Sequence, residues 1–266
     1  MPRENIFWKH KKSTNIYHNE ISKKSSGIID EKLIRDYIKS KNKLKVVDLG
    51  IGDGRELSWL ARLENIKEII GVDYSQDFLD ICREEAKKYK IKICLINDNL
   101  LSLKRLKEFI EKEKFPLIYV CLVNTFGNLK EEERKEVLKN LKKLVRNKDR
   151  LILSLYKRPE EIRNKMPLPY QVKIKGNLGG EIKLGEAIEY ASLEFFWPPI
   201  LEKYHQLPRF WYNDKTNDMT IYVGKKKILI SHRFSKEEIM EMAKKARFKT
   251  EKLIEGKFMW IVILKI

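Results

Sequence analysis

Cysteine is scarce in this sequence, and long apolar runs are missing from it. The 266 residues include three cysteines, Cys82, Cys94 and Cys121, and their spacing matches no known set of metal ligands. We therefore predict no metal site. Scattered thiols are typical of a reduced compartment. Cys94 and Cys121 lie in apolar runs, so we expect both to be buried and unreactive.

No stretch of the sequence reaches the length of a membrane-spanning helix. The segment from Met1 to Lys12 is polar and basic, and it has no apolar core of the kind that a signal peptide needs. We therefore expect a cytoplasmic protein with no membrane partner. With 42% hydrophobic and 35% charged residues, the composition indicates a globular chain, long enough for one large α/β domain or for a domain with an insertion.

Acidic residues are too few to balance the basic ones. The chain has 38 Asp and Glu against 56 Lys and Arg, which gives a formal net charge of +18. Such an excess can signal an anionic partner such as RNA. The positive charges are dispersed as lysine pairs, and a dense Lys/Glu surface also suits a protein that works at high temperature. We favour the compositional origin and keep nucleic acid as the alternative.

One short stretch combines features that a nucleotide site needs. Residues 44–49 are mostly apolar and partly β-branched, as in a strand buried on both faces. Gly50, Gly52 and Gly54 follow, and glycines permit unusual backbone angles and close approach of a ligand. Residues 56–63 then have the composition of a helix. Strand, glycine turn and helix together predict a cradle for a nucleotide-like group.

A second acid strengthens this interpretation. Asp73 ends the next apolar run, about twenty residues after the glycines, where a carboxylate can accept hydrogen bonds from ribose hydroxyls. In the dinucleotide fingerprint the third glycine follows the second by three residues, whereas Gly54 follows Gly52 by two. An ordinary tight turn would leave both Asp48 and Asp73 without a role.

The pattern Asp48-x-Gly50-x-Gly52-x-Gly54, followed by Gly71-Val72-Asp73-Tyr74-Ser75, resembles the class I S-adenosylmethionine (SAM)-dependent methyltransferases. The resemblance implies an α/β fold with a seven-stranded Rossmann-like sheet, helices on both faces and an inserted substrate-binding or lid segment. It also implies SAM as cofactor and S-adenosylhomocysteine as product. The residues that it suggests for cofactor binding are Asp48, Gly50, Gly52, Gly54, Asp73, Tyr74, Asp98, Asn99, Leu122 and Asn124.

Two of these positions have an ordinary alternative as turn residues. Asp98 follows a third apolar run, where the resembled family places a polar residue against the adenine amino group. The cluster Asn97-Asp98-Asn99 is also typical of a simple turn.

The loop after the fourth predicted strand, residues 117–123, lies where the methyl group would be transferred. Asn124 and Asn128 are our candidate catalytic residues in this loop, because their amides can orient an amine or a carboxylate. A polar turn is the alternative. The Asp/Asn-Pro-Pro-Tyr/Phe pattern of enzymes that methylate nucleobase amines is absent here. Cys121 lies within the apolar run, so we do not expect it to be a nucleophile.

Changes in pattern divide the chain into four segments, 1–43, 44–156, 157–232 and 233–266. The resemblance implies that these are an N-terminal helical cap, the SAM-binding core, a substrate-binding insertion, and a C-terminal helix and hairpin. The cap contains an expected helix over residues 31–40. In the resembled family such a segment covers the cofactor, often with an aromatic side chain that reaches the site. The resemblance therefore suggests Trp8 for substrate binding and Tyr17 for catalysis, although simple docking of the segment explains them equally well.

The insertion holds most of the aromatic candidates for substrate binding. Trp197, Tyr204, Trp211 and Tyr212 suit a cage for a methylammonium group, or else the packing of a small aromatic core. Arg209 suits a substrate carboxylate. His205 is the best-placed candidate base, with a surface histidine as the alternative. A hairpin is expected around Gly224-Lys225-Lys226.

The C-terminal segment is expected to complete the core. Ser235-Lys-Glu-Glu238 predicts a capping box that opens a helix to about Ala246, and strands are expected over residues 248–254 and 258–266. The function that we predict is SAM-dependent methylation of an amine nitrogen in a small molecule by in-line displacement. The alternatives are methylation of tRNA, rRNA or a protein, and a protein that binds SAM without catalysis.

Overall fold

The structure is a computed structural model that describes residues 31–158, 161, 209–213, 215–223, 226–256 and 259–266. Five of the predicted site residues, namely Trp8, Tyr17, Trp197, Tyr204 and His205, lie outside the described residues. For Arg209, Trp211 and Tyr212 the structure describes the backbone and not the side chains.

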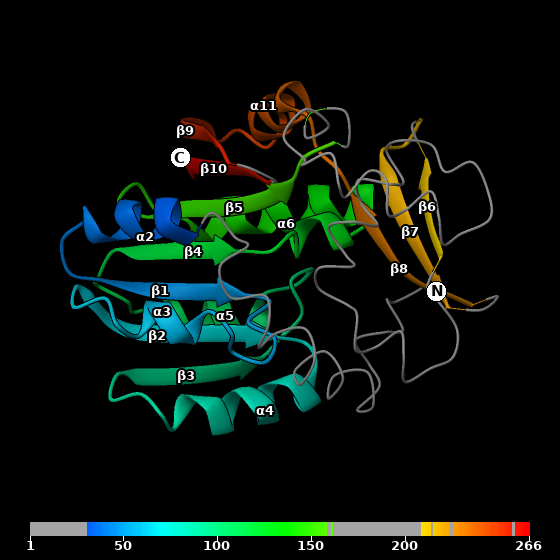
Figure 1. Cartoon of the computed structure of the whole chain (residues 1–266). Coiled ribbons are helices and arrows are strands. Elements are labelled where there is room, and N and C mark those ends of the chain that lie inside the picture. The colour runs from blue at the N-terminus through cyan, green and yellow to red at the C-terminus, as the bar shows by residue number, and fades with distance from the viewer. Residues whose placement is uncertain (1–30, 159–160, 162–208, 214, 224–225, 257–258) are drawn as a thin grey trace.

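A seven-stranded sheet forms the centre of the molecule (Figure 1). Its order is β3-β2-β1-β4-β5-β10-β9, and β10 is antiparallel to its neighbours β5 and β9. The order reverses between β1 and β4, so a crevice for a ligand is expected at their carboxyl ends. The expected Rossmann-like sheet is confirmed. The strands are β1 (Leu44–Leu49), β2 (Ile66–Asp73), β3 (Lys92–Asn97), β4 (Leu117–Cys121), β5 (Arg150–Tyr156), β9 (Lys249–Glu255) and β10 (Met259–Lys265).

Helices cover both faces of this sheet, and each face has its own apolar core. The first core packs α2 (Glu31–Lys39), α3 (Leu57–Leu60) and α4 (Gln76–Ala86) against strand residues such as Val46 and Ile118. The second core packs α5 (Lys104–Ile110), α6 (Glu131–Leu144) and α11 (Lys236–Lys245) against residues such as Val47 and Tyr119. Successive strand residues therefore alternate between two buried faces, as the continuous apolar runs predict.

Two elements are shorter than the sequence predicts. The helix expected over residues 56–63 is confined to α3, residues Leu57–Leu60. β4 ends at Cys121, two residues early, because Val123 and Asn124 have positive φ values. A residue in that conformation cannot continue a strand.

The prediction for Cys94 is wrong in one respect. Cys82 and Cys121 are buried, but Cys94 is half-buried because β3 lies at the edge of the sheet. Its Sγ lies 3.1 Å from Oε1 of Glu68.

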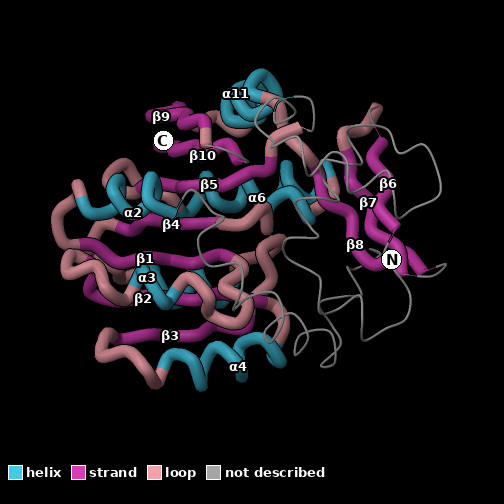
Figure 2. Tube along the Cα trace, viewed as in Figure 1, coloured by secondary structure: helices cyan, strands magenta, loops and turns pink. Residues whose placement is uncertain are grey.

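A second sheet of three antiparallel strands precedes α11 in the chain (Figure 2). It consists of β6 (Arg209–Asn213), β7 (Asp218–Val223) and β8 (Lys226–His232). The expected β7–β8 hairpin is confirmed, whereas β6 was not predicted. The backbone N–H of Phe234, just after β8, donates to the carbonyl of Tyr156 at the end of β5. This contact joins the small sheet to the large one.

The capping box predicted at Ser235 is half formed. The Ser235 hydroxyl accepts from the backbone N–H of Glu238 at 3.2 Å, as a helix N-cap should. The Glu238 side chain bonds instead to His232 and Arg158.

Among the helices that the structure describes, none combines the length and the apolar character needed to cross a bilayer.

Candidate active site

The glycine turn, residues 50–54, joins β1 to α3 and uses its three glycines in different ways. All three have positive φ, at 82°, 56° and 84°. A Cβ on Gly50 would lie 2.5 Å from Thr125, and one on Gly54 would lie 2.8 Å from Sγ of Cys82. A Cβ on Gly52 would meet no described atom within 4 Å. Gly50 and Gly54 therefore allow close packing, while none of the described residues crowds Gly52.

Asp73 ties the glycine turn to the end of β2. Its Oδ2 accepts from the backbone N–H of Gly52 at 3.0 Å, and its Oδ1 accepts from that of Ser75 at 2.9 Å. Burial raises the pKa of Asp73 to about 6, although these N–H groups oppose the shift. Each carboxylate oxygen has two lone pairs, so both can still accept a ligand hydroxyl.

Asp48 is a buried acid on β1 with an unsatisfied oxygen. Its Oδ2 has no hydrogen-bond partner among the residues that the structure describes. Burial raises the pKa of Asp48 well above its usual range, and the charges of Glu56 and Asp73 raise it further. A buried carboxylate without a partner is costly, so this oxygen is suited to a positively charged or donating ligand group.

The other predicted cofactor residues at this edge have mainly structural contacts. Asp98 accepts from the backbone N–H groups of Asn99 at 2.8 Å and Leu106 at 3.0 Å, and so helps to cap α5. Asn99 is exposed and closes a turn onto Leu101. Tyr74 is 40% exposed. The predicted contacts of Asp98, Asn99 and Tyr74 with the cofactor stay predictions.

Asn124 is fully buried in residues 122–128, called the β4 loop below. Its Nδ2 donates to the Ser231 hydroxyl at 2.8 Å and to the His232 carbonyl at 3.2 Å. Its Oδ1 accepts from the backbone N–H of Tyr156 at 3.0 Å. The amide thus connects β4, β5 and β8. Its predicted role in cofactor binding and catalysis stays a prediction, because in this structure the amide bonds to protein groups.

The rest of the β4 loop is held in a strained backbone. Val123 has φ of 52°, which is rare for a β-branched residue. Its N–H donates to the Ser154 hydroxyl at 2.7 Å, and this partly buried contact helps to fix the strained conformation. Leu122 is buried and accepts from the Thr125 hydroxyl. Asn128, our other catalytic candidate, is half-buried and its backbone N–H donates to the Asn124 carbonyl.

Buried acids gather around the glycine turn. Besides Asp48 and Asp73, the turn and the start of α3 contribute Asp53 and Glu56, and all four are at most 8% exposed. Arg55 pairs with Glu56 at 2.9 Å. This edge of a strongly basic chain is therefore acidic. The sequence pattern pointed to Asp48 and Asp73, but it gave no sign that Asp53 and Glu56 would be buried.

A histidine that sequence reasoning missed lies behind the β4 loop. His232, at the end of β8, bonds through Nδ1 to Asp218 at 2.8 Å and through Nε2 to Glu238 at 2.6 Å. Asp218 lies directly opposite His232 in the β7–β8 register. The predicted hairpin places Asp218 opposite His232, so the sequence could have revealed this pair. The contact with Glu238 depends on where α11 packs, which the hairpin does not determine.

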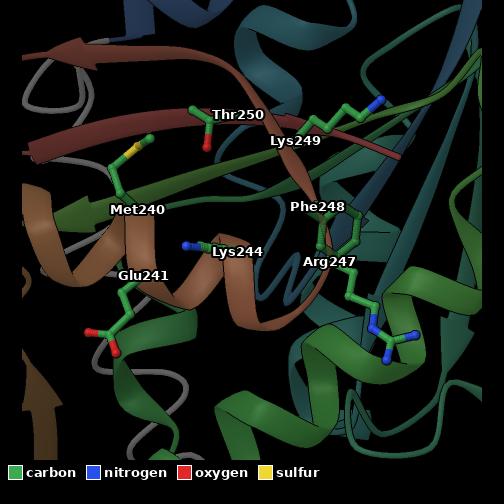
Figure 3. A pocket seen from close by; sticks show the side chains of 7 residues that line it. All are labelled: Met240, Glu241, Lys244, Arg247, Phe248, Lys249 and Thr250. Carbon is green, nitrogen blue, oxygen red and sulfur yellow. The ribbon is translucent and has the colours of Figure 1, made fainter.

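A groove of about 750 Å³ lies elsewhere, between α11 and the start of β9 (Figure 3). Strand pairing places Lys249 level with the start of β5. It therefore lies at the amino ends of the parallel strands, whereas the glycine turn lies at their carboxyl ends. The groove is therefore separate from the candidate active site. Its lining residues are Met240, Glu241, Lys244, Arg247, Phe248, Lys249 and Thr250.

Residues 46–148 match the family described as Methyltransferase domain. A curated relative, the mitochondrial ubiquinone biosynthesis O-methyltransferase of Candida albicans, is 32% identical over 90 residues. That match covers 34% of this chain and 26% of the relative, so the chain aligns with about a quarter of the relative's length.

Solved methyltransferase structures share the fold. The CcbJ methyltransferase from Streptomyces caelestis superposes with a TM-score of 0.63 at 13% identity, covering 95% of both chains. A SAM-dependent methyltransferase from Clostridium acetobutylicum gives 0.55 at 13% identity, covering 96% of this chain and 98% of its own. A Burkholderia thailandensis 1,6-didemethyltoxoflavin-N1-methyltransferase, solved with S-adenosylhomocysteine, gives 0.52 at 9% identity, covering 96% and 82%.

Residues 46–148 thus match a methyltransferase domain, and the chain shares the fold of solved methyltransferases, some of them SAM-dependent by name. The residues at the glycine turn are suited to hold SAM. Among the described residues, no atom crowds Gly52, Asp73 can accept ribose hydroxyls, and one oxygen of Asp48 has no partner and could face a cationic ligand.

Proposed function

We propose that this chain, whose residues 46–148 form a SAM-dependent methyltransferase domain, methylates an amine nitrogen of a small molecule. The observation that carries the proposal is the cluster of buried acids at the glycine turn, in a chain with net charge +18. An acidic site suits a cationic donor and a basic acceptor, and it repels the phosphates of a nucleic acid.

The buried acids favour positive ligands because their own burial is costly. Asp48 and Asp73 both have raised pKa values, chiefly through burial. A bound cation removes part of the cost of keeping them ionised. SAM carries a sulfonium and an ammonium group, so the free energy of binding it includes this compensation.

The roles of the chain's own residues are binding and alignment. The open side of Gly52 would take the donor against the main chain, and Asp73 would hold its ribose. When bound, SAM supplies an activated methyl group to a nucleophile in line with its sulfur. An amine can lose its proton to water beforehand, so the protein mainly has to align the reactants and exclude water. The rigid β4 loop would form one wall of that space.

The experiment is transfer of labelled methyl groups from SAM into a metabolite extract, followed by separation by mass. Label in low-mass amines is the expected result. Label at an oxygen, as the name of the Candida albicans relative would suggest, would mean that the acceptor atom is oxygen and not nitrogen. Label only in macromolecules would reject a small-molecule acceptor. Asp48→Asn should abolish transfer, whereas Glu84→Gln, an exposed change on α4, should not. Tight binding of SAM without any transfer would instead favour a non-catalytic binding protein.

The groove of Figure 3 supports tRNA as the second candidate substrate. Lys142, Lys244, Arg247 and Lys249 gather around Phe248, and none of them pairs with a carboxylate in the part of the chain that the structure describes. Desolvation and the neighbouring charges of Lys249 and Arg247 lower the pKa of Lys142. Binding of tRNA that weakens steeply with salt would favour this candidate.

A further inference from the structure

His232 occupies the corner where the three-stranded sheet meets the core. It is the last residue of β8, and Phe234 and Ser235 then lead into α11. The residue is 6% exposed, and its imidazole bonds to one carboxylate on β7, Asp218, and to one on α11, Glu238. One side chain thus connects two elements from different parts of the fold.

The backbone beside His232 connects to the candidate active site. The Nδ2 group of Asn124 donates to the His232 carbonyl and to the Ser231 hydroxyl. Asn124 in turn accepts from the N–H of Tyr156 and receives at its carbonyl the N–H of Asn128. Displacement of the end of β8 would therefore remove two of the contacts that hold the β4 loop.

We propose that His232 is a positioning residue: as an imidazolium bonded to Asp218 and Glu238, it holds the end of β8 against Asn124 and so keeps the β4 loop rigid. A neutral imidazole has a single N–H and can donate to one of these carboxylates. The other carboxylate would then face a ring nitrogen lone pair at less than 3 Å. The contact with both elements therefore depends on the charged form.

The charges that surround the ring favour the proton. Asp218 of β7, Glu238 of α11 and Glu131 of α6 contribute negative charge, and Arg134 of α6 and Arg158 after β5 contribute positive charge. These five groups sum to −1, so an imidazolium makes the cluster neutral. The two carboxylate hydrogen bonds raise the pKa of His232 above 6.5, although burial and Arg134 oppose them.

The sign of the pH dependence follows. Because the pKa of His232 is raised in the folded state, its simultaneous bonds to Asp218 and Glu238 are fully formed below about pH 6.5. They are lost as the pH rises through the higher pKa of the folded state. The same geometry makes His232 a poor general base. Each ring nitrogen already bonds to a carboxylate, so neither is left to take a proton from an acceptor.

The first test is an NMR titration of the 266-residue chain from about pH 5 to about pH 9. The His232 signals are identified by their loss in His232→Gln. The expected midpoint lies above 6.5, with both ring N–H groups present below it. A midpoint at or below 6.5 would overturn the proposal. Asp218→Asn and Glu238→Gln, which keep the histidine, should each lower the midpoint, and they serve if His232→Gln does not fold.

The second test measures amide hydrogen exchange at Asn124 and Asn128 over the same pH range, corrected for intrinsic exchange rates. Protection should fall above the His232 midpoint, by up to tenfold for each pH unit by which the midpoint exceeds 6.5. His232→Gln should show no such step, and the exposed change Glu84→Gln should keep it. A step that persists in His232→Gln, or its absence from the unmodified protein, would refute the proposal. Neither test needs a methyl acceptor, so failure here is distinct from failure of the proposed function.

Discussion

Protonation of Asp73 is expected to weaken binding of the cofactor. The carboxylate lies at the end of β2 with its oxygens on the N–H groups of Gly52 and Ser75, and burial raises its pKa to about 6. An ionised carboxylate accepts hydrogen bonds from two ribose hydroxyls and attracts the donor's positive charge. The protonated acid loses that charge and part of its accepting capacity.

The size of the effect follows from the pKa. With a value of about 6, roughly 97% of Asp73 is ionised at about pH 7.5 and roughly 9% at about pH 5. If only the ionised form binds well, the dissociation constant for SAM rises about tenfold over this interval, which is about 1.4 kcal/mol. Asp48 also has a raised pKa, and its protonation would add to the loss.

Isothermal titration calorimetry with SAM at a series of pH values measures this effect. Asp73→Asn should bind weakly and lack the Asp73 component, while Asp48→Asn should retain the tenfold change because burial and backbone contacts set the Asp73 pKa. A dissociation constant that is flat between about pH 5 and about pH 7.5 would refute the reasoning. So would an unchanged pH profile in Asp73→Asn.

Three further predictions concern single positions. Gly127→Ala would place a carbon 2.4 Å from the Asn124 amide, so a urea titration should show a loss of about 1–3 kcal/mol in unfolding free energy; an unchanged midpoint would contradict the confinement of that amide. The Cβ added by Gly52→Ala meets no described atom within 4 Å, so the change should cost only about 1–2 kcal/mol of stability, through the positive φ. It should still lower SAM affinity at least about tenfold, because the methyl group would fill the space for the cofactor. Full affinity in calorimetry would mean that the cofactor binds elsewhere. The double change Arg247→Glu and Lys249→Glu should reduce the slope of the logarithm of the tRNA binding constant against the logarithm of salt concentration by about two. SAM affinity should not change. A slope equal to that of the unmodified protein would exclude the groove as a tRNA contact.

The sheet and the glycine turn could be predicted because their signals are local. Residues 44–49 show a strand buried on both faces, and the glycines that follow permit the positive φ values that the turn adopts. Asp73 could be found because β2 is adjacent to β1 in both sequence and space. Each of these features depends on neighbours within about thirty residues, a range over which sequence patterns carry structural information.

Other features depend on contacts that no local pattern encodes. An apolar strand suggested that Cys94 is buried, but the strand order places β3 at the sheet edge. Asn124 had the composition of a turn or a catalytic amide, and its partners lie 32 residues away at Tyr156 and 107 away at Ser231. The bond between His232 and Glu238 required α11 to fold back beside β8.

The sequence by itself determined the α/β class and the position of the glycine turn. These follow from backbone conformation and from the alternation of buried faces, which are properties of short segments. Only the tertiary structure decided which polar groups bond to other protein groups and which have an oxygen left to bond to a ligand. Asn124 is satisfied by protein groups, whereas Oδ2 of Asp48 has no partner among the described residues. The difference arises because the partners of a buried polar group are the groups that the folded chain places beside it.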